Sequence, residues 1–332
     1  MRTLTVWLAR APPIGLRSGL VPRLLLIVSV LVAALVLPAT ASATFPGQNG
    51  RIVFASDGLS CTPRCKLAPR LFTVDPDGRN LWPVGAPIFT RGAPFADGNP
   101  KWSPDGKRIA FDRQTLDAGG SIVDETVWVM GEWGFGARPL AHGRLAGWTP
   151  DGRVVLSDPA TNGLALINAD GSGRTTLSDT FDGSTWAWSP DGQSIAFERG
   201  SDIFVMRADL SGQTDVTNTL ALADGAPSWS PDGGHIAYSC QIPLFSNVCA
   251  AGSDGSGATS LTTFAEPFAA RQPVYSPDGR LVAFGRTAAY PDGRWTLWRM
   301  NADGSRQREI TRRPVTALDW QPVRPRGHGP DR

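Results

Sequence analysis

Histidine is scarce in this chain of 332 residues, which contains only His142, His235 and His328. A metal-dependent lyase or a general-base pair needs such side chains to converge, and these three stand far apart in the sequence. The chain also lacks a Gly-x-Ser-x-Gly segment, the turn that presents the serine nucleophile in α/β-hydrolases. The sequence therefore gives no support for a histidine metal centre or for a serine peptidase of that type.

An excess of one charge sign is lacking as well. Lys and Arg number 32 and Asp and Glu number 30, for a formal net charge of +2. Four arginines and no acids lie in the first 43 residues, so removing that segment turns the charge to −2. We therefore expect no nucleic-acid partner and no general attraction to an anionic membrane surface.

Long apolar runs are missing too, because the longest, Leu24–Leu37, has 14 residues and is broken by Ser29. That is short for a membrane span. Arginines precede it, and the small residues Ala41-Ser42-Ala43 follow it, which is the pattern of a secretory signal peptide. The sequence predicts a signal over residues 1–43 and a periplasmic or secreted mature protein with no stable membrane span. An uncleaved N-terminal anchor is the alternative.

The mature protein has four cysteines in two local pairs, Cys61/Cys65 and Cys240/Cys249. In an oxidising compartment this spacing predicts two short-range disulfides. The alternative is a thiolate metal site, but the pairs lie far apart and no histidine stands beside either. We expect disulfides, no metal ion and no cofactor.

What the sequence has in quantity is turn residues, with 37 glycines and 28 prolines, which favour an all-β fold. One phrase, Trp-Ser-Pro-Asp-Gly followed by an apolar-Ala-Phe strand, returns along the sequence. It is complete at Trp102–Gly106 and Trp188–Gly192 and varied elsewhere. The aromatic marks are Trp102, Trp148, Trp188, Trp229, Tyr275 and Trp320, at intervals of 46, 40, 41, 46 and 45 residues.

A period of 40 to 50 residues with several short strands in each unit is typical of a β-propeller with four-stranded blades. Six marks predict six blades over residues 44–323. The segment Asn49–Ser56 matches a second strand without its own first strand, and Leu318–Pro322 is a first strand without a successor. We therefore predict that the C-terminal strand completes the N-terminal blade. The polar tail, residues 324–332, is predicted to be disordered.

These repeats resemble the TolB-type β-propeller family, the WD-repeat-like propellers with a Ser-Pro-Asp-Gly core. The match covers residues 49–323, and several copies agree in both residues and spacing. The resemblance implies a protein or peptide partner. Two departures separate this protein from periplasmic TolB: there is no room for an α/β domain between Ala43 and Asn49, and blade two has Gly131–Gly136 in place of an Asn-Ala-Asp-Gly turn.

Connections of variable length are expected to collect on one face of the ring, and such a face commonly binds partners. Arginines end three second strands there, at Arg113, Arg199 and Arg286. Guanidinium groups pair bidentately with carboxylates, so they could bind an acidic peptide or sugar. The alternative is that each pairs with a nearby acid such as Asp117, Asp202 or Asp292. The further rim candidates are Phe89, Arg91, Phe95, Phe268, Arg271 and Tyr290.

We therefore expect an exported, non-enzymatic and monomeric propeller that binds a protein or peptide on its loop-bearing face. The alternative is a saccharide-cleaving or hydrolytic enzyme with acids at the mouth of the central channel. Its candidate residues are Asp97, Asp182, Asp224 and Glu266.

Overall fold

A computed structural model describes most of the protein after the predicted signal. The described residues are 44–56, 70–85, 95–117, 121–158, 163–178, 183, 185–217, 223–242, 245–265, 267–288 and 293–324. Over these ranges the regular structure is entirely β, and none of it is a helix that could cross a membrane.

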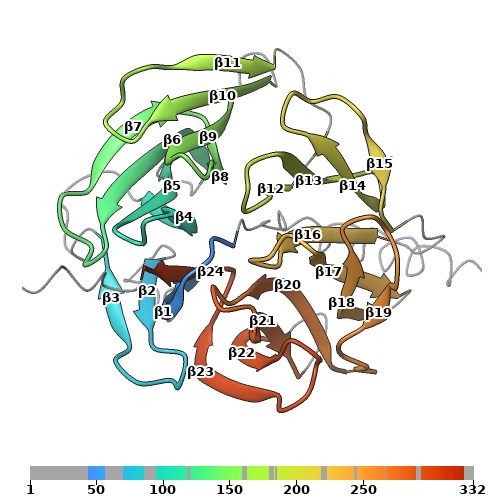
Figure 1. The fold of residues 1–332 in the computed structure, drawn as a ribbon. Coiled ribbons are helices and arrows are strands. Elements are labelled where there is room, and N and C mark those ends of the chain that lie inside the picture. Colours follow the sequence, from blue (N-terminus) through green and yellow to red (C-terminus); the bar gives the residue numbers. More distant parts are fainter. Residues whose placement is uncertain are drawn as a thin grey trace, which may run out of the picture. The chain divides into compact units, whose positions relative to one another are not determined.

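Six antiparallel sheets of four strands fan around one axis (Figure 1). We number these blades in sequence order, and each is given from its innermost strand outward. Blade 1 contains β24 (Ala317–Val323), β1 (Gln48–Ser56), β2 (Arg70–Val74) and β3 (Trp82–Val84); blade 2 contains β4 (Phe95–Trp102), β5 (Arg108–Leu116), β6 (Ile122–Gly131) and β7 (Arg138–His142); blade 3 contains β8 (Arg144–Trp148), β9 (Arg153–Asp158), β10 (Gly163–Asn168) and β11 (Thr175–Ser178). Blade 4 contains β12 (Trp186–Trp188), β13 (Ser194–Arg199), β14 (Asp202–Arg207) and β15 (Thr214–Asp215); blade 5 contains β16 (Ala223–Trp229), β17 (His235–Ile242), β18 (Phe245–Gly252) and β19 (Thr259–Ser260); blade 6 contains β20 (Ala269–Tyr275), β21 (Leu281–Thr287), β22 (Thr296–Asn301) and β23 (Arg308–Pro314). The predicted fold class, an all-β six-bladed propeller, is confirmed.

The Ser-Pro-Asp-Gly turn is held by its own side chains, as blade 4 shows. The Ser189 hydroxyl donates to Asp191 at 2.6 Å and accepts the backbone N–H of Ser194 at 2.9 Å. The Asp191 carboxylate also accepts the N–H of Gln193, and Gly192 takes a positive φ of 74°. The Ser189 hydroxyl and the Gln193 N–H lower the pKa of Asp191. Turn chemistry thus accounts for the repeated aspartates without a bound cation.

The aromatic marks pack between neighbouring blades. Trp102, Trp148, Trp229 and Trp320 are each 3% exposed or less. The Trp148 indole N–H donates to the Lys101 carbonyl of the preceding blade at 3.0 Å, and Trp229 donates in the same way to Ala187 at 2.9 Å. The marks therefore fill the space between sheets, and the indoles of Trp148 and Trp229 also tie neighbouring inner strands together.

Both ends of the described polypeptide meet in blade 1, where β1 pairs with β24 (Figure 1). Ile52 lies opposite Trp320, and Phe54 lies opposite Leu318. All four side chains are nearly fully buried in one cluster with side chains of blade 6. The predicted closure of the ring by the C-terminal strand is confirmed.

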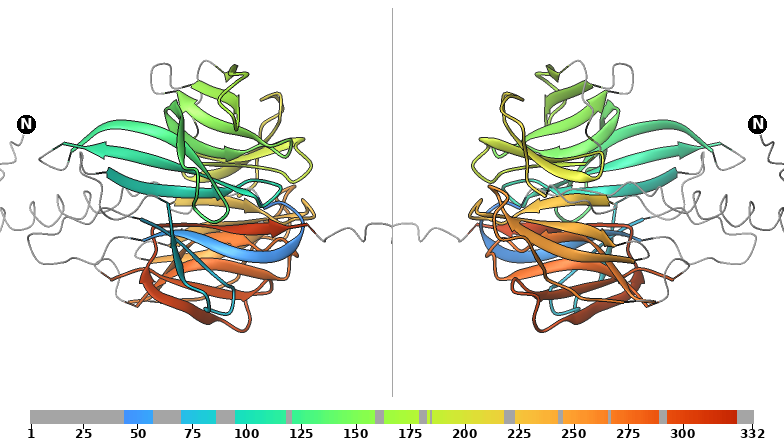
Figure 2. Two further views of the ribbon diagram at one scale, coloured as in Figure 1. Left: turned by 90° about the vertical axis from the view of Figure 1, so that its left-hand side faces the viewer. Right: turned by 90° about the vertical axis from the view of Figure 1, so that its right-hand side faces the viewer.

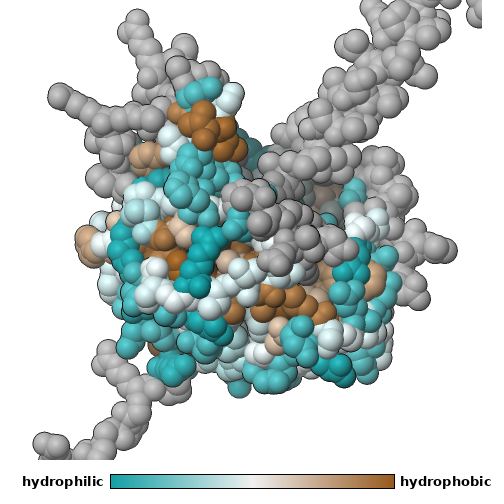
Figure 3. All heavy atoms as spheres, turned by 90° about the horizontal axis from the view of Figure 1, so that it is seen from above, coloured by the Kyte–Doolittle hydropathy of each residue, from teal (hydrophilic) through white to brown (hydrophobic). Residues whose placement is uncertain are grey.

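The ring has two faces, which we name from their connections. The turn face carries the links from first to second and from third to fourth strands, and the loop face carries the other links. Figure 2 shows the hairpin of β5 and β6 projecting beyond the ring on the loop face. Viewed from the side of β10 and β11, the surface is mostly hydrophilic with separate apolar patches (Figure 3).

The second turn of one blade rests on the outer strand of the blade before it. At Gly304 in blade 6, a Cβ would overlap the carbonyl oxygen of Leu261. At Gly134 in blade 2, a Cβ would lie 2.8 Å from the backbone nitrogen of Gly85 in blade 1. Only a residue without a Cβ permits this approach of two backbones.

We predict that Gly304→Ala is more destabilising than Gly152→Ala. The two glycines have similar φ angles, +84° and +86°, but no atom lies within 4 Å of a Cβ at Gly152. Both variants should lose about 1–2 kcal/mol from the left-handed backbone, and Gly304→Ala should lose about 1–3 kcal/mol more from the overlap. Chemical denaturation measures both free energies. Equal losses would contradict the contact between blades.

Candidate functional site

The structure describes six of the nine predicted rim residues, namely Phe95, Arg113, Arg199, Phe268, Arg271 and Arg286. All six lie on the part of the blades next to the loop face. Phe89, Arg91 and Tyr290 lie outside the described residues, as do the cysteines Cys61 and Cys65 and the acids Asp182 and Glu266.

Arg113 on β5 is the centre of a buried cluster in blade 2. Its Nε and Nη2 donate to the two carboxylate oxygens of Asp97 on β4, at 2.6 and 2.8 Å. The guanidinium lies 4.2 Å from the ring centroids of both Phe95 and Trp128. Burial raises the pKa of Asp97, and Arg113 opposes that rise. Arg113 is thus neutralised within the blade, although its partner is Asp97 rather than the predicted Asp117.

Arg286 on β21 lies in the corresponding place in blade 6, among three aromatic rings. Its Cζ is 4.3 Å from the ring centroid of Phe264, 4.4 Å from that of Trp298 and 5.0 Å from that of Phe268. The side chain is half-buried, and burial lowers its pKa while the charge of Glu309 raises it. Glu309 itself pairs with Arg312 at 3.5 Å.

The other two described arginines of the rim also stack on aromatic rings. Arg199 lies 4.9 Å from the Phe197 ring and donates to the Gln213 side chain at 2.6 Å. Arg271 lies 3.9 Å from the Trp295 ring. Arg199 and Asp202, which were predicted to pair, face each other in the β13–β14 ladder.

In blade 5 a disulfide stands where other blades place an arginine and an aromatic ring. Cys240 faces Asp224 in the ladder as Arg113 faces Asp97, and Cys249 faces Tyr238 as Trp128 faces Phe111. Cys240 and Cys249 are joined, with their Cα atoms 5.7 Å apart. The second of the two predicted disulfides is confirmed.

Three charged side chains are buried where blades 1, 2 and 3 meet, namely Lys101, Asp112 and Asp319. The Asp319 carboxylate accepts the backbone N–H of Trp102 in blade 2 at 2.6 Å, and Asp112 accepts that of Leu145 in blade 3 at 2.6 Å. Burial lowers the pKa of Lys101 to about 8, although the charges of Asp319 and Asp112 oppose this. Burial also raises the pKa of Asp112 to about 7. Asp319 therefore joins blade 1 to blade 2, and Asp112 joins blade 2 to blade 3. Their negative charges favour the protonated form of Lys101.

The N-terminal stretch ahead of β1 crosses the centre of the ring on the turn face (Figure 1). The Thr44 hydroxyl lies 3.3 Å from the Ser228 hydroxyl of blade 5 and donates to the Tyr275 carbonyl of blade 6. Phe45 is buried in a cluster with Trp148 of blade 3. Gly47 donates to the Pro277 carbonyl at 3.1 Å. This stretch thus links blades 3, 5 and 6 on the turn face.

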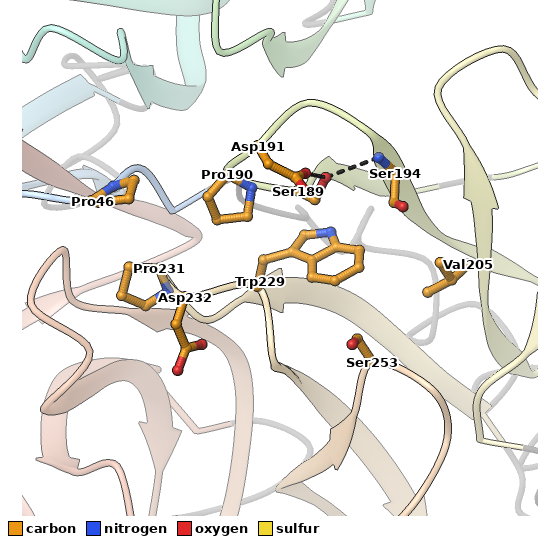
Figure 4. A pocket seen from close by; sticks show the side chains of 11 residues that line it. Pro46, Ser189, Pro190, Asp191, Ser194, Val205, Trp229, Pro231, Asp232 and Ser253 are labelled. Carbon is orange, nitrogen blue, oxygen red and sulfur yellow. Dashed lines mark hydrogen bonds between the residues drawn. The ribbon is translucent and has the colours of Figure 1, made fainter.

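Beside that stretch, a pocket of about 410 Å³ opens between blades 4 and 5 (Figure 4). The Trp229 ring lies between the Pro190 and Pro231 sides, and Pro46 closes one end. The two carboxylates of the lining, Asp191 and Asp232, accept hydrogen bonds from the serines of their own turns. These two carboxylates are therefore committed to their own turns, and the wall of the pocket is polar and apolar in about equal parts.

The acidic side chains bear on the enzymatic alternative and on a metal site. Over the described ranges no group of three or more His, Cys, Asp or Glu side chains is placed to hold a metal ion. Asp97 is bound to Arg113, and Asp224 is 1% exposed. Of the four acids named for the enzymatic alternative, these two are therefore buried in their blades.

The structure adds functional candidates that the sequence analysis missed. Phe264, Trp128 and Trp298 complete the arginine clusters, and Lys101, Asp112 and Asp319 form the buried charge cluster. The sequence did contain a signal for one shared feature, because the segments Asp97-Gly98-Asn99-Pro100 and Asp224-Gly225-Ala226-Pro227 both have Asp-Gly at the start and Pro at the end. Asn99 and Ala226 take positive φ angles of 46° and 53° at register shifts in β4 and β16. This repeated bulge places Asp97 and Asp224 at equivalent points.

Comparison with known proteins finds distant sequence relatives and solved structures with the same fold. No protein-family profile matches the sequence. An uncharacterized protein of Agrobacterium fabrum is 26% identical over 193 residues, which are 56% of this protein and 64% of that one. The crystal structure of TolB from Acinetobacter baumannii has a TM-score of 0.63 and 18% identity, covering 82% of this protein and 67% of that one. The fold is that of the TolB-type β-propellers.

Enzymes share this propeller as well. The tricorn protease has a TM-score of 0.59 and 16% identity, covering 84% of this protein and 27% of that one. Identities of this size show the fold alone. The function of this protein must therefore be argued from its own side chains.

We predict that the Asp112 carboxylate makes stability fall as pH rises from about 4 to 7. Its folded pKa is raised above the unfolded value, so the stability from its protonated form is complete below the unfolded pKa and is lost as pH rises through about 7. Asp112→Asn should therefore gain stability relative to the parent across this window, by more than about 1 kcal/mol. Denaturation at pH 5, 6, 7 and 8 measures the difference.

Asp191→Asn is the matched control. The pKa of Asp191 is lowered, so its contribution is complete above the unfolded pKa and is lost only as pH falls below it. Its difference from the parent should stay constant between pH 5 and 8. A constant difference for Asp112→Asn as well would refute the buried titration.

Proposed function

We propose that this protein is an exported, non-enzymatic propeller that binds a protein or peptide through its loop face. The observation that carries the proposal is the set of stacked arginines beside that face. Arg199, Arg271 and Arg286 are each held by aromatic rings within 5 Å of the guanidinium carbon. Arginine and aromatic side chains are the residues enriched at protein interfaces and at their energetic centres.

The turn face supports this choice by contrast. Its Ser-Pro-Asp-Gly turns satisfy their own polar groups, and residues 44–49 contact blades 3, 5 and 6 there. An exception is the edge of blades 1 and 2, where Trp82, Trp133 and Phe135 are 65%, 60% and 80% exposed. The Arg51 guanidinium lies 4.0 Å from the Trp133 ring. This aromatic edge is the competing partner surface.

Export is supported by the disulfide and by the N-terminal pattern. Cys240–Cys249 requires a compartment in which disulfides persist. In protein recovered from the native envelope or medium, alkylation without prior reduction should leave both Cys240 and Cys249 unlabelled, because neither carries a free thiol. Labelling of both in freshly trapped native protein would contradict export to an oxidising compartment.

Site-specific photo-crosslinking in the native host separates the two surfaces. A photoreactive residue at Val123 or Ala265, exposed on the loop face, should give discrete protein adducts. The same residue at Asp209, on a turn of blade 4, is the control and should give none. Placed at Phe135, it reports on the aromatic edge. Adducts from Phe135 alone would move the interface to that edge, and the absence of adducts at every position would refute protein binding.

A further inference from the structure

The arginine clusters of blades 2 and 6 are copies of one arrangement. Phe111 pairs with Trp128 across β5 and β6, and Phe284 pairs with Trp298 across β21 and β22. Arg113 and Arg286 each follow the Phe by two residues. Phe95 and Phe268 each precede the aromatic mark of their blade by seven residues, and each ring lies within 5.0 Å of its guanidinium.

The two copies differ at the position that faces the arginine. Asp97 lies opposite Arg113 in the β4–β5 ladder, and Ala270 lies opposite Arg286 in the β20–β21 ladder. Both ladders shift register just beyond this point, so the local backbone is equivalent. Blade 6 therefore keeps the arginine and the flanking rings of blade 2 and lacks the carboxylate.

This difference leaves the hydrogen-bonding edge of Arg286 unused within the described part of the protein. Among those residues its side chain has no hydrogen-bond or ion-pair partner, and Glu309, the acid that acts on its pKa, pairs with Arg312. Aromatic faces attract the charge of a guanidinium but accept few of its five N–H donors. Stacking also fixes the plane of the group, so little freedom is lost when a planar anion binds.

We propose that Arg286 binds a carboxylate of the peptide ligand, in the place that Asp97 fills in blade 2. The proposal rests on the proposed function of the loop face and names the chemistry of its ligand: an aspartate, a glutamate or the terminal carboxylate of a peptide. Phe264, Phe268 and Trp298 form the apolar wall against which the adjoining peptide packs. Two N–H donors of the guanidinium meet the two carboxylate oxygens, as they do between Arg113 and Asp97.

The test is an NMR titration of the arginine Nε–H resonances of the mature protein. The probe is N-acetylglutamate α-amide, with galacturonate as the sugar carboxylate and sodium chloride at matched ionic strength. The resonance of Arg286, assigned from Arg286→Lys, should shift and saturate with the glutamate probe but not with chloride. Arg113, already bonded to Asp97, is the internal control and should not respond.

Exchanging the residues that face the two arginines sharpens the test. Ala270→Asp gives blade 6 its own carboxylate and should weaken the response of Arg286 at least tenfold. Asp97→Ala makes blade 2 resemble blade 6 and should give Arg113 a saturable response. Ala270 is fully buried, so the NMR response of Ala270→Asp is interpreted only if this variant folds. If it does not fold, the responses of Asp97→Ala and Arg286→Gln decide the test. Arg286→Gln should remove the glutamate-dependent shift from the spectrum.

An unchanged Arg286 resonance, or an equal shift with chloride, overturns the carboxylate site. Tighter binding of galacturonate than of the glutamate probe overturns the assignment to a peptide. Neither result depends on the crosslinking adducts, so loop-face adducts with a silent Arg286 would leave protein binding intact and remove only this site.

Discussion

Pairing of β1 with β24 is the constraint on which the rest of this molecule depends. Each blade is a twisted sheet with two apolar faces, and a ring covers all of them only when no blade is missing a strand. Trp320 and Leu318 from the C-terminal strand pack with Ile52 and Phe54 in the cluster between blades 6 and 1. Without that strand, both neighbouring interfaces lose their inner wall, and the positions of the rim arginines are no longer fixed.

The sequence predicted the architecture well because its signal is local and repeated. The aromatic mark, the proline and glycine of the turn and the apolar strand that follows lie within about ten residues, so each copy reports on short-range backbone geometry. The closure was also predictable, since an unpaired strand at each end leaves one arrangement that removes both edges. The same reasoning placed the Cys240–Cys249 disulfide, whose partners lie on adjacent strands of one hairpin.

The environment of the candidate site was harder to predict, for two physical reasons. Asp97 and Arg113 meet only because a bulge at Asn99 sets the register of β4 against β5, and sequence spacing alone does not show which acid an arginine reaches. Lys101, Asp112 and Asp319 meet across three blades, and such contacts depend on how the sheets rotate about the axis. Arg199, Arg271 and Arg286 were expected at the rim, but their neighbours Phe204, Trp295 and Trp298 come from other strands and loops.

The route of the N-terminal stretch bears on biosynthesis. Residues 44–49 touch blades 3, 5 and 6, and β1 pairs with β24 as well as with β2. The contacts of the earliest described residues are therefore complete only after the last strand has been made. Contacts between such distant positions form slowly, and an apolar strand with an open edge attracts other polypeptides in the meantime. A nascent polypeptide of this kind therefore keeps one edge of β1 without its final neighbour until the C-terminal strand arrives.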